Sequence, residues 1–197
     1  MAAAVYLGLV HYPIYNKNNE IVTTAITNFD VHDIARTSRT YDIKKYFIIH
    51  PLESQTALAQ EILSYWRDGF GGEYNPDRKE ALSIVTLISS IAGAIEDIEK
   101  AEGKRPIVVT TDARKYDNTV SYLQLRQRLQ TDDTPCLVLF GTGWGIERQV
   151  MAGFDYILEP IYGPGAYNHL PVRAAVAIIL DRLCGESWWP TGETVAE

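Results

Sequence analysis

Short apolar runs alternate along the chain with segments of helical period. The runs span residues 5–10, 46–49, 107–109, 136–140 and 156–158. Apolar runs of this length are typical of strands that are covered on both faces. Because such strands alternate with helical segments, the pattern favours an α/β fold with a mostly parallel sheet and helices on both of its faces.

Three segments place apolar residues on one helical face. The first stripe comprises Leu58, Ile62, Leu63 and Trp66. The second comprises Leu82, Val85, Ile88, Ala92, Ile95 and Ile98, and predicts one long helix opened by Asn75-Pro76-Asp77. The third comprises Val172, Val176, Ile179, Leu180 and Leu183, and ends at Gly185. We therefore expect a single domain over residues 1–185, followed by a tail over 186–197 that includes Trp188 and Trp189.

The composition is that of an ordinary globular chain, with 46% hydrophobic and 22% charged residues among 197. Cys136 and Cys184 each lie in an apolar run, which indicates inert core thiols and a reducing cytoplasm. No apolar stretch reaches the roughly 18 residues of a membrane span, and the start of the chain lacks the features of a signal peptide. We expect a cytoplasmic protein without membrane contact.

The formal net charge of −7, from 18 basic and 25 acidic residues, limits one class of function. A protein that wraps nucleic acid by charge alone is basic overall. Any contact with RNA must therefore come from a local basic patch.

The strand predicted at 136–140 runs directly into Gly141, Gly143 and Gly145, and Ile146-Glu147-Arg148 is suited to begin a helix. Glycines at such a junction let the backbone adopt positive φ and approach a ligand closely. A tight turn that binds nothing is a second interpretation. A dinucleotide loop is a third, although the spacing is not G-x-G-x-x-G and no acidic strand end follows about 20 residues later.

Two further loops follow. Glu159-Pro160-Ile161 ends the strand at 156–158, and residues 163–171 lead into the last helix, with Pro171 near its first turn. Ligands of open parallel sheets collect beyond the carboxyl ends of the strands, so the three loops predict one concave site. His169 is typical of a packing or helix-start residue rather than a metal ligand, since no partner stands at ligand spacing. We expect no structural metal.

Segments 139–145, 157–161, 167–173 and 178–183 resemble the cofactor loops of SPOUT RNA methyltransferases, specifically the small bacterial branch related to the tRNA (guanine-N1) methyltransferases. The resemblance is strongest over about 107–185. It implies a deep trefoil knot in that part, S-adenosylmethionine as cofactor, tRNA or rRNA as substrate, and a homodimer paired through the knotted region. By the same match, 110–114 is the first knot loop. The implied cofactor-binding residues are Thr110, Thr111, Leu139, Phe140, Gly141, Thr142, Gly143, Trp144, Gly145, Ile157, Leu158, Glu159, Pro160, Ile161, Tyr167, Asn168, His169, Leu170 and Arg173.

Residues 28–41 contain two arginines one helical turn apart, on a helix that Asp30 or Asp33 would cap. A solvated helix face is the plainer interpretation. The segment is also similar to the first motif of the superfamily, in which an asparagine and a glycine precede Ala-Arg-Thr-Ala and the arginine meets the RNA. In this match Arg36 is that arginine, whereas Asp30 replaces the asparagine and His32 the glycine. Because of these two differences from the motif, the resemblance does not identify the RNA atom that accepts the methyl group.

Methyl transfer requires an acceptor held in line with the methyl group and the removal of one proton. We therefore expect Arg36, Asp33 and His32 to be the catalytic residues, with Asp112 as a further candidate base. The predicted RNA-binding residues are Arg36, Arg39, Lys44 and Lys45. An inactive cofactor- or RNA-binding protein of the same fold is the main alternative, and an unrelated nucleotide-dependent α/β enzyme is a distant third.

Overall fold

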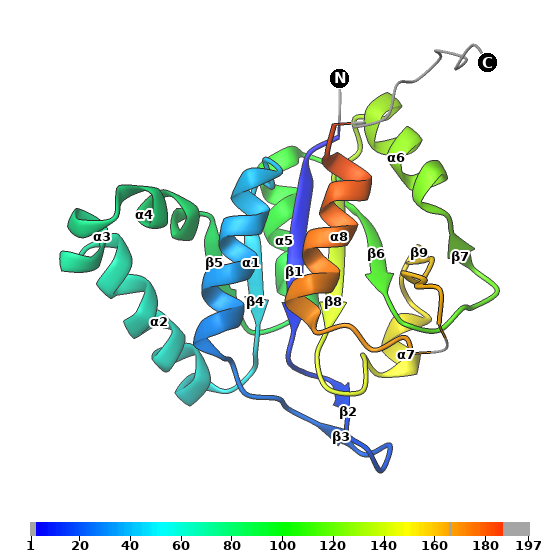
Figure 1. The fold of residues 1–197 in the computed structure, drawn as a ribbon, viewed down its shortest axis with the longest axis horizontal. Helices are drawn as coiled ribbons and strands as arrows, with labels where there is room; N and C mark the ends of the chain where they lie inside the picture. Colours follow the sequence, from blue (N-terminus) through cyan, green and yellow to red (C-terminus); the bar gives the residue numbers. More distant parts are fainter. Residues whose placement is uncertain (1–2, 166, 187–197) are drawn as a thin grey trace.

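A computed structural model describes residues 3–165 and 167–186 (Figure 1). The strands are β1 (Val5–Val10), β2 (Ile14–Tyr15), β3 (Ile21–Val22), β4 (Tyr46–Ile49), β5 (Val85–Ile88), β6 (Ile107–Thr111), β7 (Thr119–Val120), β8 (Cys136–Gly141) and β9 (Tyr156–Leu158). The helices are α1 (Asn28–Thr40), α2 (Glu53–Arg67), α3 (Phe70–Tyr74), α4 (Pro76–Ser83), α5 (Ile91–Glu102), α6 (Tyr122–Thr131), α7 (Arg148–Met151) and α8 (Val172–Cys184).

The described strands form a seven-stranded sheet with the order β5-β4-β1-β8-β6-β9-β7, and every pairing in it is parallel. The hairpin of β2 and β3 forms a separate antiparallel pair. The carboxyl ends of the strands lie at the lower edge of the sheet in Figure 1, where the hairpin, α7 and the start of α8 gather. All five strands predicted from the sequence are confirmed.

Two apolar layers enclose the sheet. Val5, Leu7 and Leu9 of β1 point to a cluster with the buried faces of α1, α2, α4, α6 and α8. Tyr6 and Val10 point the other way, to a cluster with α5 and α7. This alternation follows from the period of two along a strand, and the predicted mostly parallel sheet with helices on both faces is confirmed.

The long helix predicted from Asn75 to Ile98 is wrong. The segment forms α4, then strand β5, then α5. The three-residue spacing of Leu82, Val85 and Ile88 matched a helix by coincidence, but residues 84–88 are rich in β-branched side chains and pair with β4. Ser90 then opens α5, since its hydroxyl oxygen accepts from the N–H of Gly93.

The other two helical stripes are confirmed as helices α2 and α8. On α2 the buried face is rotated from the predicted one: Leu58 is exposed, whereas Ala59 and Leu63 are buried. Burial raises the pKa of both cysteine thiols, that of Cys184 to about 11, so both are protonated at neutral pH as predicted for core thiols.

The single domain over 1–185 and the tail over 186–197 stay predictions. Residues 187–197, with Trp188 and Trp189, lie outside the described residues. Within the described ranges, no helix has the length and apolar character needed to cross a membrane.

Candidate functional site

A cavity of about 780 Å³ opens at the carboxyl ends of β6, β8 and β9. Its volume is within the range of pockets that bind small ligands, and its position is where open parallel sheets bind them. The three loops predicted to meet do meet here. The lining residues are Ala25, Thr27, Asp30, Thr111, Asp112, Ala113, Arg114, Phe140, Gly141, Thr142, Gly143, Trp144, Gly145, Glu159, Pro160, Ile161, Asn168, His169, Leu170, Pro171, Val172, Ala175 and Ile179.

The glycine loop after β8 needs its glycines for conformation. Gly143 has φ +54° and Gly145 has φ +100°, where side chains with a Cβ are strained. The loop is also joined to the hairpin: Trp144 N–H donates to Tyr15 O at 3.0 Å, and Tyr15 N–H donates to Gly145 O at 2.9 Å. The sequence does not reveal this support, since strands of two residues leave no periodic signal.

The helix predicted to begin at 146–148 is confirmed as α7. The Glu147 carboxylate accepts from the N–H groups of Gln149 and Val150, each at 2.9 Å. Such a cap satisfies donors that the first turn leaves free, so it fixes where the chain leaves the glycine loop.

Asp112 forms the centre of a polar group that lies beside Gly145 at the cavity. Its two carboxylate oxygens accept from Nε and Nη2 of Arg114, both at 2.9 Å, and one also accepts from Tyr116 Oη at 3.2 Å. Hydrogen bonding to Asp112 raises the pKa of Arg114. Arg114 and Tyr116 thus occupy both carboxylate oxygens of Asp112, and its role as a base stays a prediction.

The two later loops are each tied to a neighbour. Glu159 Oε1 accepts from Tyr122 N–H at 2.7 Å, at the start of α6. Asn168 Nδ2 donates to Ala113 O at 2.9 Å, which joins the loop before α8 to the loop after β6. The second contact closes one side of the cavity.

Helix α1 supplies a further wall. The predicted caps Asp30 and Asp33 are wrong, because α1 begins at Asn28 and its cap is Thr27, whose oxygen accepts from Asp30 N–H at 3.2 Å. Asp30 stands in the first turn instead. Its carboxylate accepts from Thr27 Oγ1 at 2.6 Å, and the residue is buried at the cavity.

Most of the predicted cofactor-binding residues line the cavity, and six do not. Thr110, Leu139, Ile157 and Leu158 are buried within the sheet, and Tyr167 is 80% exposed. Arg173 contacts helix α1 instead of the cavity. Its Nη1 donates to Asp33 Oδ2, and its Nε lies 3.8 Å from Asp30 Oδ1. Its guanidinium lies over the Phe29 ring.

None of the three predicted catalytic residues lines the cavity. His32 packs edge-on against Trp66 with ring centroids 5.3 Å apart, and burial lowers its pKa. Asp33 pairs with Arg173. Arg36 is exposed on α1. The residue of this motif that lines the cavity is Asp30, for which the sequence predicts only a cap or a substitute for the motif asparagine.

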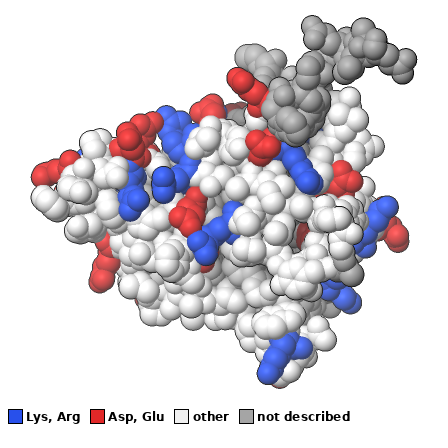
Figure 2. Space-filling view, viewed as in Figure 1, with Lys and Arg blue, Asp and Glu red and all other residues white. Residues whose placement is uncertain are grey.

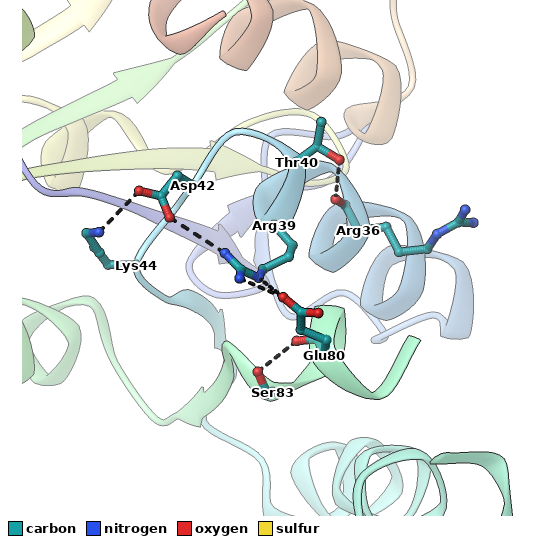
Figure 3. A network of polar contacts seen from close by, with 7 residues as sticks. All are labelled: Arg36, Arg39, Thr40, Asp42, Lys44, Glu80 and Ser83. Carbon is teal, nitrogen blue, oxygen red and sulfur yellow. Dashed lines mark hydrogen bonds and ion pairs between the residues drawn. The ribbon is translucent and has the colours of Figure 1, made fainter. Parts of the chain in front are cut away.

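The four predicted RNA-binding residues do not form an unpaired basic patch. Arg39 bonds Glu80 at 2.6 Å, Lys44 pairs with Asp42 at 3.3 Å, and Lys45 pairs with Asp97 at 2.7 Å. Figure 3 shows the Arg36 side chain extending away from the pair of Arg39 and Glu80. Among the described residues, no carboxylate forms an ion pair with Arg36.

The surface charge agrees with this pairing. On the face shown in Figure 2, basic and acidic side chains are interspersed and large areas carry neither. In the described part of the chain, no cluster of three or more His, Cys, Asp or Glu side chains is arranged to hold a metal ion.

Comparison with known proteins identifies relatives over nearly the whole chain. The sequence model of a family described as "SAM-dependent RNA methyltransferase" matches residues 4–185. An uncharacterized protein of Aquifex aeolicus is 50% identical over 91% of this chain and 87% of its own length. A tRNA (guanine-N(1)-)-methyltransferase of Oleidesulfovibrio alaskensis is 43% identical over 93% of this chain, which spans only 42% of that protein.

A solved structure shares the fold. The SpoU methyltransferase AviRb from Streptomyces viridochromogenes, in complex with the cofactor AdoMet, is 12% identical, with a TM-score of 0.56 over 93% of this chain and 60% of that one. The trefoil knot over about 107–185 stays a prediction.

Proposed function

The chain belongs to the family of S-adenosylmethionine-dependent RNA methyltransferases, which confirms the SPOUT resemblance, and on this premise we propose that the cavity at the ends of β6, β8 and β9 holds the cofactor and that a tRNA or rRNA nucleotide is methylated there. The observation that carries the proposal is the convergence of the glycine loop, the loop after β9 and the loop before α8 on one cavity.

The lining suits an adenosyl sulfonium compound. Phe140, Ile161 and Leu170 offer apolar walls for a flat heterocycle, as small-molecule sites commonly do. Asp30 contributes a carboxylate near which a sulfonium cation is favoured. When bound, S-adenosylmethionine supplies an electrophilic methyl group, so the chain has to position the acceptor and remove one proton.

Asp30 and Arg36 divide that work in our proposal. Asp30, at the cavity wall, accepts the proton of the acceptor or orients it. Arg36 lies six residues later on α1, about 9 Å further along the helix axis. An RNA strand that crosses α1 can therefore place its nucleotide at Asp30 and a neighbouring phosphate at Arg36, whose planar fork suits phosphate oxygens.

The substrate class and the assembly are proposals too. The name of the Oleidesulfovibrio alaskensis relative includes tRNA, but more than half of that protein lies outside the match, so the guanine N1 atom does not carry over from it. We propose tRNA or rRNA as the substrate, and a homodimer paired through residues 107–185.

Two measurements test the function. Calorimetry with S-adenosylmethionine and S-adenosylhomocysteine should show binding of both, and radiolabelled methyl should pass to total RNA from a strain that lacks the gene. Mass spectrometry of the nucleosides in that RNA then identifies the missing modification. Failure of either ligand to bind the folded protein would refute the cofactor site.

The position of Arg36, Asp33 and His32 outside the cavity favours one alternative, a cofactor- or RNA-binding protein without catalysis. Binding of the cofactor with no transfer to any RNA pool would support that alternative.

A further inference from the structure

Two buried histidines and two half-buried threonines form a chain of polar contacts that ends in the glycine loop. His11, next after β1, and His50, next after β4, are both buried, with ring centroids 5.6 Å apart. His11 Nδ1 lies 3.0 Å from Thr24 Oγ1, and His50 Nε2 lies 3.0 Å from Thr24 O. Thr24 Oγ1 in turn lies 2.6 Å from Thr142 Oγ1, in the glycine loop.

The direction of each hydrogen bond follows from counting protons. The Thr142 hydroxyl donates to Val10 O at 3.0 Å, so its single proton is used there. Thr24 must then donate to Thr142, and His11 Nδ1 must donate to Thr24. Nδ1 of His11 therefore carries a proton.

His50 is fixed in the same way. Its Nδ1 accepts from Leu52 N–H at 3.1 Å, so its proton is on Nε2, which donates to Thr24 O. Thr24 is thus held at its side chain by one histidine and at its carbonyl by the other. Ala25 and Thr27, which line the cavity, lie one and three residues after Thr24 in the chain.

We propose that His11 is a positioning residue of the cofactor site, which holds the glycine loop and the adjoining wall at 24–27 in place through Thr24 and Thr142. The proposal rests on the cofactor site described above. His11 does not line the cavity, so it acts only through these neighbours.

His50 must be neutral because its Nδ1 accepts, and a neutral His11 is favoured because, among the described residues, its Nε2 has no acceptor for a second proton. In the part of the chain that the structure describes, Nε2 of His11 is buried without a hydrogen-bond partner. Burial, and then the neighbouring His50, lower the pKa of His11 to about 4, and burial also lowers the pKa of His50. At neutral pH the hydrogen-bond chain is therefore intact.

Three variants test the proposal by calorimetry with S-adenosylhomocysteine. His11→Leu removes the Nδ1 donor, and Thr24→Val removes the hydroxyl that joins it to Thr142. Each variant should raise the dissociation constant for S-adenosylhomocysteine about tenfold or more, the scale of a lost hydrogen bond. His11→Asn keeps a donor near the Nδ1 position and should bind within about threefold of wild type. The control is Leu63→Ala on α2, a core change remote from the cavity, which should lower stability and leave affinity unchanged.

A second readout does not depend on the cofactor. The N–H groups of Trp144 and Gly145 bond to Tyr15 O and Thr142 O, so their hydrogen exchange reports opening of the loop. Exchange should accelerate in His11→Leu, not in Leu63→Ala, and nitrogen NMR should find the His11 proton on Nδ1.

Unchanged affinity and exchange in His11→Leu, or a proton on Nε2, would overturn the positioning role. If the wild type binds no cofactor, the proposed function fails, and the exchange rates and tautomer still decide the role of His11.

Discussion

Arg173 of α8 donates from Nη1 to Asp33 Oδ2 of α1 across 2.5 Å, and this pair joins two helices that are 140 residues apart in sequence. Both side chains are partly exposed, so the pair contributes about 0.2–1 kcal/mol. We expect Arg173→Met to lower the free energy of unfolding by about that amount in urea titrations. Because Arg173 does not line the cavity, cofactor affinity should change less than about threefold.

Asp33→Asn completes a double-mutant cycle, and the two changes should be non-additive since they remove one interaction. A tenfold loss of cofactor affinity in Arg173→Met would return this residue to the cofactor site.

Gly143 and Gly145 give a second prediction. A Cβ on Gly143 would lie 3.0 Å from Ile14 Cγ2 and 3.2 Å from Tyr15 O, so a side chain there collides with the hairpin and also occupies a strained φ. Gly143→Ala should cost about 1–2 kcal/mol of stability, and Gly143→Val should abolish cofactor binding as the loop is displaced. Thermal unfolding and calorimetry measure the two effects.

Gly163→Ala is the matched control, because a Cβ at Gly163 has open space and its φ is not positive. The strain argument would be contradicted if Gly163→Ala and Gly143→Ala lost the same stability.

The third prediction concerns pH. The pKa of His11 is lowered from 6.5 to about 4 in the folded protein, so between these values the unfolded chain binds more protons. Stability should therefore fall as pH falls through this window. From pH 7 to pH 5 the contribution of His11 is about 2 kcal/mol. Urea titrations of the wild type and of His11→Asn at pH 7 and pH 5 isolate this contribution, since the variant lacks the imidazole. Stability that changes equally with pH in the two proteins would contradict the prediction.

The fourth prediction is the assembly. We expect a homodimer at micromolar concentration, since the SPOUT resemblance implies pairing through the knotted region. Sedimentation of a stable 22.1 kDa monomer would contradict it.

The sequence predicted the strands and the loops that line the cavity because their signals are local. Apolar runs such as residues 136–140 mark buried strands, and glycines at a strand end mark a turn that approaches a ligand. β5 was missed because its spacing from Leu82 imitates a helix, and its pairing with β4 is a tertiary effect.

The sequence could not predict the polar contacts at the site for a different reason. The link from His11 to Thr142 spans 131 positions, and Arg173 and Asp33 are also far apart in the chain. No spacing rule connects such residues. The motif match pointed to α1, yet only the three-dimensional structure shows that Asp30 of this helix lines the cavity.

Arg36 gives the last prediction, which separates an enzyme from a protein that only binds. It lies outside the cavity, so Arg36→Ala should leave cofactor affinity almost unchanged. If its guanidinium steadies an RNA phosphate during the reaction, methyl transfer should slow about a hundredfold. Arg36→Lys should recover little, because a point charge cannot replace a two-point fork.

Arg39→Ala is the comparison, since Arg39 sits one turn away on the same helix but already bonds Glu80 through Nε and Nη2 (Figure 3). Because Glu80 already pairs with Arg39, Arg39→Ala should weaken RNA binding only modestly and should cost less transfer than Arg36→Ala. Radiolabelled transfer to RNA from the gene-deleted strain, run beside cofactor calorimetry, measures both. If Arg36→Ala lost cofactor affinity and methyl transfer equally, Arg36 would belong to the cofactor site. If Arg36→Ala and Arg39→Ala lost methyl transfer equally, Arg36 would have no special role.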